Sequence, residues 1–503
     1  MSDNPSPDRI IEDLGGCGRF QVRMSIVVHM MKTLVTFSVT SMIIISPTPK
    51  WWCDDESKYK NISSCVQHEN GTQTIVCTLE SCSVNWSACN NYGYSETGTI
   101  VEEFNLVCNQ DYIPSTVMTL QVAGTLAGNL LAGQISDMFG RKPPFFTSIV
   151  ILIVSNLIGF LSFNWIMFAV ARVLVGLGAG CFLSVQYSLL SEFSLAKWRS
   201  WIIGFPSWPI QACVFALLGW LIQDWRHIQL LCCLLGVPCL LAWFVIPESF
   251  RWYIAHDKPE KAEVIIRRIA AFNKRQLYHV GHLIEKPKST TPSFHKYSVI
   301  DMLSSKLLIR ITLLSALNWF ALGLVSYGLA FEIQALSGNV YLNFFLFSLV
   351  GIPSKGIGIW LQNRLGRRLL TMVCYAIVGI CGIIVGTVQS INAENRDILT
   401  NTFALIAYAI IALAWGPIQT MTIELYPTVI RNVSFGTLGV VGRVGAMVGP
   451  QLVYLNNYVT GLLYFVCGAV SFICVAGCVG LPETKDSNLS DKLGETKNVA
   501  TPV

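Results

Sequence analysis

Residues 133–142 read Gly-Gln-Ile-Ser-Asp-Met-Phe-Gly-Arg-Lys, and a related stretch, Leu-Gln-Asn-Arg-Leu-Gly-Arg-Arg, returns at residues 361–368. Asp137 in the first copy corresponds to Asn363 in the second. Two further pairs of residues also recur. Glu192 with Arg199 in the first half corresponds to Glu424 with Arg431 in the second, and Pro247-Glu248 corresponds to Pro482-Glu483. Parallel repetition of two mostly apolar halves predicts a transporter that alternates access around a central site.

The composition excludes an ordinary soluble protein, because 52% of the residues are hydrophobic and 13% are charged. The apolar stretches are ~20 residues long, enough to cross a bilayer core of ~30 Å. In lipid the backbone must pair internally, so each stretch should be a helix. We expect an all-α membrane protein with twelve transmembrane helices in two six-helix bundles. The expected spans are 24–45, 114–136, 144–162, 165–190, 201–222, 226–246, 307–330, 340–362, 369–388, 400–422, 433–456 and 459–481.

Positive charge in the loops predicts the orientation in the membrane. Short loops between the expected helices and the segment 247–308 are rich in Lys and Arg, whereas loop 47–113 carries three lysines and nine acids. Cytoplasmic loops carry the excess of Lys and Arg, so we expect a plasma-membrane protein with both termini inside. The net charge of +5 follows from these loops and does not indicate nucleic acid. The expected organisation is a cytoplasmic N-terminus 1–23, a first bundle 24–246 with its outer loop 47–113, a cytoplasmic segment 247–306, a second bundle 307–481 and a cytoplasmic tail 482–503.

Loop 47–113 has the features of an extracellular segment. Three N-x-S/T sequons, at Asn61, Asn70 and Asn85, predict glycosylation there. Six of the seventeen cysteines also lie in this loop, and an even set in an oxidising compartment predicts three disulfides whose pairing the sequence leaves open. The cysteines are Cys53, Cys65, Cys77, Cys82, Cys89 and Cys108.

The repeated charges at the cytoplasmic ends of the helices are candidates for a gate. Opposite charges at a bundle mouth can pair when the halves close and separate when they open. An exposed pair contributes about 1 kcal/mol, and several together bias a two-state equilibrium. Ordinary solvated loop charge is the simpler alternative, but repetition in both halves favours a gate. The candidates are Asp137, Arg141, Glu192, Arg199, Glu248, Arg251, Arg367, Glu424 and Arg431.

Several of these motifs resemble known families. Gly133-x3-Asp137-x2-Gly140-Arg141-Lys142 resembles the loop 2–3 signature of the major facilitator superfamily. Further marks, which together cover nearly the whole chain, resemble the organic cation/anion transporter family, solute carrier family 22. They are Gly-Arg-Phe-Gln at 18–21, the Cys-rich loop, Pro-Glu-Ser-Phe-Arg-Trp at 247–252, and Glu-Leu-Tyr-Pro-Thr at 424–428 with Arg431. Two residues depart from the family: Phe250 replaces a usual Pro, and Asn363 replaces the Asp usual in cation-type members.

Ionisable residues within the spans indicate the charge of the substrate. Lys32, Arg172, Lys355 and Arg443 lie inside expected helices, whereas no Asp or Glu lies at comparable depth and Glu332 is at an outer end. An ionised side chain near mid-membrane costs ~3 kcal/mol on insertion scales and usually has a role. Four such cations without a counter-ion predict that an organic anion supplies the missing charge.

Each cation also has a structural interpretation. Arg172 precedes Gly176 and Gly180 and resembles a structural motif of helix 4 in the superfamily, and Lys32 could extend along its helix towards water. Lys355 follows Pro353, whose break would let it face a cavity, and Arg443 has glycine neighbours that would leave room for a ligand.

The family resemblance also bears on Lys355 and Arg443. Ile352-Pro-Ser-Lys355 resembles helix 8 of organic anion transporters, and Gly442-Arg-Val-Gly445 resembles the helix 11 arginine of anion and carnitine members. Tyr408 stands near the place where anion members often carry another Lys. We therefore expect Lys355 and Arg443 to be the main anion-binding residues.

The predicted function is secondary transport of small organic anions by alternating access, and the resemblance implies exchange for an internal dicarboxylate. Trp319, Tyr327 and Trp415 are candidates to contact the organic part, although single aromatic residues in membrane helices mostly pack. We expect no enzyme activity, cofactor or metal, and no partner besides membrane lipid and a weakly indicated PDZ domain at Thr-Pro-Val 501–503. The alternatives are a cation, carnitine or zwitterion carrier, and a transport-dead receptor or scaffold of the same fold.

Overall fold

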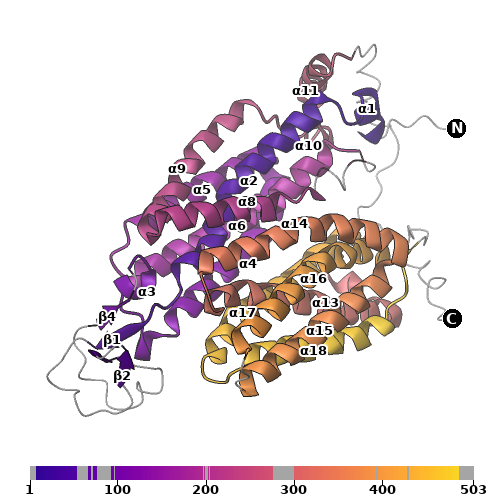
Figure 1. The fold of residues 1–503 in the computed structure, drawn as a ribbon. Helices are drawn as coiled ribbons and strands as arrows, with labels where there is room; N and C mark the ends of the chain where they lie inside the picture. Colours follow the sequence, from indigo (N-terminus) through magenta and orange to yellow (C-terminus); the bar gives the residue numbers. More distant parts are fainter. Residues whose placement is uncertain are drawn as a thin grey trace.

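The computed structural model shows two bundles of long helices joined by a central segment (Figure 1). We call the end where residues 46–53 and 97–112 lie the loop end. We call the end where the first long helix begins and the last one ends the termini end. The described residues are 7–53, 66–69, 72–75, 92–95, 97–195, 198, 202, 204–275, 299–391, 395–427 and 430–485.

The N-half and the C-half each contain six long helices, as the sequence predicts. The helices of the N-half are α2 (Arg19–Ile45), α4 (Ile113–Phe139), α5 (Lys142–Phe160), α6 (Trp165–Glu192), α8 (Ser207–Ile222) and α9 (Trp225–Leu241). The helices of the C-half are α13 (Lys306–Glu332), α14 (Val340–Leu365), α15 (Arg367–Ile391), α16 (Arg396–Leu425), α17 (Arg431–Asn456) and α18 (Leu462–Val479).

The remaining elements lie at the two ends of the bundle. At the loop end, β1 (Trp51–Cys53) pairs antiparallel with β4 (Tyr92–Tyr94), and β2 (Val66–Glu69) pairs with β3 (Thr72–Ile75). The short helices are α1 (Pro7–Asp13), α3 (Ile100–Glu103), η2 (Cys108–Gln110), η3 (Ala242–Phe244), α10 (Phe250–Ala255), α11 (Pro259–Phe272), η4 (Val299–Leu303) and η5 (Ile333–Ala335).

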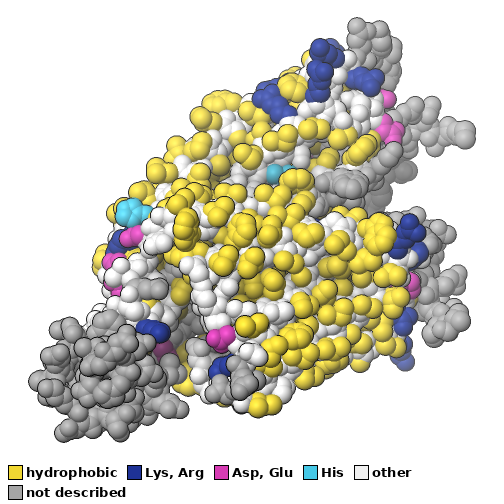
Figure 2. All heavy atoms as spheres, viewed as in Figure 1, with side chains coloured by type: hydrophobic (Ala, Val, Ile, Leu, Met, Phe, Trp, Pro, Cys, Tyr) yellow, Lys and Arg dark blue, Asp and Glu magenta, His cyan; other side chains and the backbone are white. Residues whose placement is uncertain are grey.

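Ten helices in the described ranges are long and apolar enough to cross a membrane, fewer than the twelve expected spans. The other two are α4, which is long but rich in Gly, Gln and Thr, and α8, which is short. The expected span 201–222 is interrupted, because Pro206 precedes the helix and α8 begins at Ser207. On the face shown in Figure 2, hydrophobic side chains cover both bundles and charged side chains gather at the ends, as expected of a membrane protein.

Glycine allows two pairs of helices to approach closely. A Cβ on Gly176 of α6 would lie 2.0 Å from the carbonyl oxygen of Gln121 on α4, and one on Gly180 would lie 2.2 Å from that of Thr125. In the C-half, a Cβ on Gly323 of α13 would lie 1.9 Å from the carbonyl oxygen of Gly442 on α17. Small residues at such interfaces stabilise helix pairs in lipid, where the hydrophobic effect does not.

The two halves pack through α4 against α17 and through α8 against α14. Every hydrogen bond found between described residues of the two halves lies nearer the loop end. Thr119 is at the centre of this contact: it donates to the carbonyl of Met447 at 3.3 Å and accepts from the amide of Gln451 at 2.9 Å. The two halves are therefore joined by hydrogen bonds at the loop end.

Candidate functional site

Arg172 is buried inside the N-half and is 1% exposed. Its Nη1 donates to the backbone oxygen of Ser38 at 2.9 Å and to the hydroxyl of Ser41 at 3.0 Å, both on α2. The guanidinium also lies 5.0 Å from the centre of the Phe168 ring. These contacts join α6 to α2, so the arginine ties helices of one bundle together.

Arg443 lies at mid-length of α17 in the C-half and is half-buried. Its Nη1 donates to the phenol oxygen of Tyr327 on α13 at 2.5 Å, and its guanidinium carbon lies 5.8 Å from the centre of that ring. No ion pair to a carboxylate is found for it within the described ranges. The guanidinium thus keeps donors for a further acceptor.

The glycines beside Arg443 do not make room for a ligand, contrary to the sequence expectation. A Cβ on Gly445 would lie 2.1 Å from the carbonyl oxygen of Phe320, so this glycine serves the packing of α17 on α13, as Gly442 does. The expected break at Pro353 is also absent, because α14 runs through this residue from Val340 to Leu365. Arg443 and Lys355 therefore project from regular helices.

Lys32 and Lys355 come from different halves. Lys32 of α2 donates to the hydroxyl of Ser207 at 3.3 Å and lies 5.8 Å from the Trp208 ring, at the start of α8. Lys355 of α14 is close enough to repel it electrostatically. Both side chains are half-buried, although each starts from the middle of a long helix. Lys32 and Lys355 thus bring positive charge from both halves to the region where the halves meet.

Aromatic side chains surround Arg443 and its neighbours on the C-half side. Trp319 is 4% exposed, bonds the Thr422 hydroxyl at 2.9 Å and meets Trp415 edge-on at 6.3 Å, so it belongs to the core. Trp415 is half-buried, and its indole N–H donates to the Ser326 hydroxyl at 3.0 Å. Of the three predicted aromatic residues, Trp415 and Tyr327 are the ones with partly accessible side chains.

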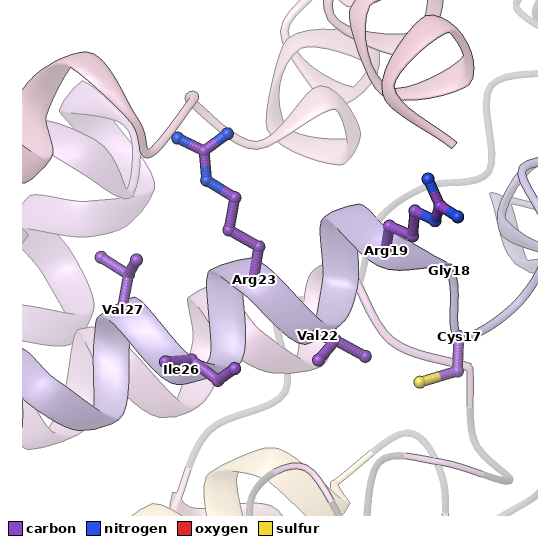
Figure 3. Close-up of a pocket in the computed structure, with 7 residues that line it drawn as sticks. All are labelled: Cys17, Gly18, Arg19, Val22, Arg23, Ile26 and Val27. Carbon is purple, nitrogen blue, oxygen red and sulfur yellow. The ribbon is translucent and has the colours of Figure 1, made fainter. Parts of the chain in front are cut away.

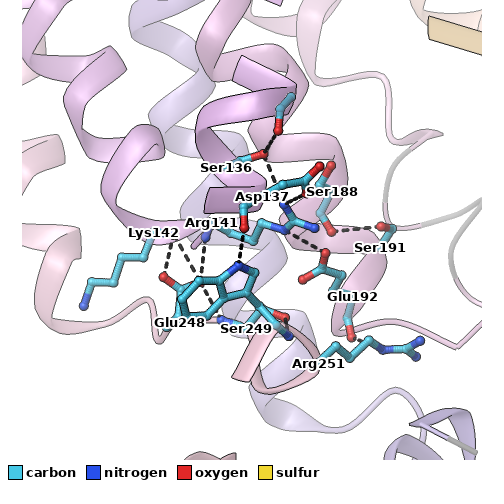
Figure 4. Close-up of polar contacts among 12 residues, drawn as sticks. Ser136, Asp137, Arg141, Lys142, Ser188, Ser191, Glu192, Glu248, Ser249 and Arg251 are labelled. Atoms are coloured by element: carbon cyan, nitrogen blue, oxygen red, sulfur yellow. Dashed lines mark hydrogen bonds and ion pairs between the residues drawn. The ribbon is translucent and has the colours of Figure 1, made fainter. Parts of the chain in front are cut away.

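The charges at the termini end of the N-half form one cluster around Arg141 (Figure 4). Its Nη1 lies 2.6 Å from the carboxylate of Asp137, and its Nε lies 2.9 Å from that of Glu192. Burial acts to lower the pKa of Arg141, but these two carboxylates outweigh it and raise the pKa. Glu248 accepts from the backbone N–H of Arg141 at 2.8 Å, and Arg251 donates to the backbone oxygen of Glu192 at 3.0 Å.

The C-half repeats the core of this cluster. Arg367 pairs with Glu424 at 3.0 Å, and its backbone N–H donates to Glu483 at 2.9 Å. Gly140 and Gly366 have φ of 99° and 94°, and a Cβ on either would collide with the capping carboxylate. In each half, the glycine therefore leaves room for a glutamate to accept from the backbone N–H groups at the start of the following helix: Glu248 for α5 and Glu483 for α15.

The ion pairs found among the described residues of the two clusters each join side chains of the same half. Arg431 has two buried nitrogens without a hydrogen-bond partner, Nε and Nη2, whereas Glu192, Arg367 and Glu424 each have one such atom. Arg199 lies outside the described residues, as do the sequons and the C-terminal PDZ motif. Of the six loop cysteines, Cys108 is disulfide-bonded. Whether these charges gate transport remains a prediction.

The sequence did not reveal which polar residues join the halves at the loop end. Ser46 donates to the side-chain oxygen of Gln334 at 2.9 Å. Tyr454 and Tyr458 both donate to the carboxylate of Asp111, at 3.3 and 2.6 Å. These residues belong to no motif, and they meet only through the packing of α4 on α17 and of α2 on η5.

An open groove of about 470 Å³ lies at the start of α2, at the termini end (Figure 3). Arg19 and Arg23 line it and are exposed. The groove contains none of the predicted substrate-binding residues and is away from the middle of the bundle, so it is not the candidate site.

Comparisons with known proteins agree with this architecture. The chain is 26% identical to an organic cation transporter protein of Drosophila melanogaster over 98% of this chain and 94% of that protein. It is 29% identical to organic cation/carnitine transporter 2 of Homo sapiens, over 84% of this chain and 75% of that protein. It is also 29% identical to solute carrier family 22 member 7 of Rattus norvegicus, over 84% and 78%.

A solved structure matches the fold along almost its whole length. The xylose transporter XylE from E. coli, in its inward open conformation, matches with a TM-score of 0.63 at 16% identity, covering 95% of this chain and 99% of that one. Residues 73–492 match the family described as sugar (and other) transporter. The chain therefore belongs to this family of the major facilitator superfamily, as a secondary transporter and not an enzyme, with relatives in solute carrier family 22.

Proposed function

We propose that this transporter carries small organic anions, bearing a carboxylate or sulfate, by alternating access between its two halves. The observation that best supports this is Arg443, a half-buried guanidinium whose one side-chain hydrogen-bond partner among the described residues is the phenol of Tyr327. A charged donor in a low-dielectric setting favours an ionised acceptor, and a planar guanidinium matches a carboxylate or sulfate. Arg443 would hold the acidic group and the nearby aromatic rings the organic body.

Lys32 and Lys355 support the same reading. They are on α2 and α14, in different halves, and repel each other. Like charges in a medium of low dielectric constant raise the energy of the empty site, and an anion between them lowers it. A bound anion would therefore draw the two halves together, which is what an alternating-access carrier requires of its substrate.

A carnitine-type zwitterion is the second candidate, and the names of the relatives favour it. Arg443 would then bind the carboxylate. The ammonium group would lie against aromatic faces such as those of Tyr408 and Phe347, whose ring centres are 5.2 Å apart. The two lysines argue against a ligand with a fixed positive charge. A transport-dead receptor is a further alternative, and absence of uptake would support it.

We infer that the protein lies in the plasma membrane, with the loop end outside the cell and the termini end in the cytoplasm. We also infer that the substrate is exchanged for an internal dicarboxylate. The structure would then be closed to the outside, because the halves are bonded at the loop end. Arg431 would find a carboxylate partner when the termini end closes. Substituting Asn61, Asn70 and Asn85 together tests the orientation: loss of a glycan shift on gels supports it, and an unchanged band refutes it.

Paired uptake tests the substrate class. Cells expressing the protein receive a labelled aromatic carboxylate, a labelled quaternary ammonium compound and labelled carnitine in parallel. Uptake of the carboxylate alone, stimulated by preloaded dicarboxylate, is the expected result. Uptake of the ammonium compound or carnitine without the carboxylate would refute the anion proposal and leave the transporter function intact.

A further inference from the structure

Glu332 is a buried carboxyl group that the proposed substrate site does not use. It is the last residue of α13 and is 2% exposed. Its Oε1 accepts from the side-chain amide of Asn456 on α17 at 3.0 Å. Its Oε2 is buried without a hydrogen-bond partner. The carboxyl group is therefore only half satisfied.

The groups around Glu332 bear on whether its carboxyl group can be ionised. The titratable groups that interact with it are Tyr464 and Cys467 of α18, which are neutral when protonated, and α17 contributes only the amide of Asn456. The phenol oxygen of Tyr464 is itself buried without a partner. No Lys, Arg or His pairs with Glu332 within the described ranges. An ionised carboxylate without a counter-ion is costly in such a place, whereas a protonated one is not.

Glu332 and its partner Asn456 lie next to residues that form hydrogen bonds between the two halves. Two residues after it, Gln334 of η5 accepts from Ser46 of α2, in the other half. Asn456, its one partner, lies between Tyr454 and Tyr458, which bond Asp111 of the N-half. Opening the loop end must break these contacts and move both segments that enclose the carboxyl group.

We propose that Glu332 is a proton-binding site that couples the closing of the loop end to protonation. A proton bound to Oε2 allows the carboxyl group to be buried in the closed state. When the loop end opens, water reaches the group and the proton leaves to solvent. Protons thus favour the closed state, and one linked proton changes the conformational equilibrium by at most about tenfold per pH unit. The proposal rests on the transporter function and not on the charge of the substrate.

The first test measures uptake of the transported compound against external pH, from 5.5 to 8.5. We expect the rate of the wild type to depend on pH, and that of Glu332→Gln, which mimics the protonated group, to be flat. Glu332→Asp keeps a carboxyl group and should retain pH dependence, which separates loss of the proton from loss of the fold. Asp397→Asn, an exposed carboxyl group in the first turn of α16 at the same end, is the matched control and should keep the wild-type slope.

The second test does not require transport, so it remains decisive if the proposed function fails. Hydrogen–deuterium exchange of the η5 segment in the purified protein is measured over the same pH range, corrected for intrinsic exchange. We expect protection to rise at low pH in the wild type and to be independent of pH in Glu332→Gln. A wild-type profile in the Gln variant would overturn the proposal. Protection that requires sodium would also overturn the proposal, if it is lost both when choline replaces sodium and in Glu332→Gln. The cation bound at Glu332 would then be a metal ion and not a proton.

Discussion

Each half has an arginine among its membrane helices, and the two arginines differ in burial and in hydrogen-bond partners. Arg172 in the N-half is buried against the backbone and hydroxyl groups of α2, whereas Arg443 in the C-half is half-buried and bonds one phenol. Arg172 is 1% exposed and enclosed by its own bundle, with its Nη2 buried without a partner, whereas Arg443 is partly accessible to another molecule. A cation among membrane helices therefore indicates a substrate site only when a ligand can reach it.

Helix packing differs between the halves in a related way. In the N-half the close glycine contact joins α4 to α6, the helix of Arg172, while in the C-half it joins α13 to α17, the helix of Arg443. The second contact sets Tyr327 beside Arg443. Close packing at glycine therefore positions the structural Arg172 in the N-half and orients Arg443, the candidate binding residue, in the C-half.

Replacing Arg172 should have the largest effect on stability. Arg172→Met removes hydrogen bonds from a charged group to Ser38 and Ser41, and we expect a loss of about 3 kcal/mol. Arg443→Met should lose only about 1 kcal/mol, the contribution of its hydrogen bond to Tyr327. Thermal unfolding of the two purified variants measures this difference. Equal losses would mean that both arginines are structural and would remove the contrast between the halves.

Replacing Lys355 should have a smaller effect, on affinity alone. Lys355→Ala removes one positive charge from the meeting of the halves, and a loss of about 1.4 kcal/mol would raise the KM for an anion about tenfold. A neutral ligand should be affected least. Lys485→Ala, a surface lysine at the termini end, is the control. A KM for anions that stays at the wild-type value would exclude Lys355 from the site.

Removing one hydroxyl group should have the smallest effect. Tyr327→Phe deletes the acceptor that holds the Arg443 guanidinium, a hydrogen bond that contributes about 1 kcal/mol, so uptake at low substrate concentration should fall about fivefold. Initial uptake rates at matched surface abundance provide the measurement. An unchanged rate would show that Arg443 needs no such orientation.

Much of the fold was readable from the sequence because lipid imposes long apolar helices and the polar clusters repeat. The fifth span is interrupted where the sequence predicted one helix, because residues 202 and 204 are helical, residues 205–206 are not, and α8 begins at Ser207. The structural interpretation of Arg172, Gly176 and Gly180 agrees with their packing against α2 and α4. The contacts of Asp111 and Glu332 could not be predicted, because they depend on how α4, α13 and α17 meet at the loop end.

The most direct test of the central claim is uptake of a labelled aromatic carboxylate by Arg443→Asp. Measured beside the wild type at equal surface abundance, the variant should fall to background, since its carboxylate repels the acidic group that the guanidinium binds. Arg443→Lys, which keeps the charge, should retain part of the uptake. Undiminished uptake by Arg443→Asp would contradict the account and place the anion elsewhere in the bundle.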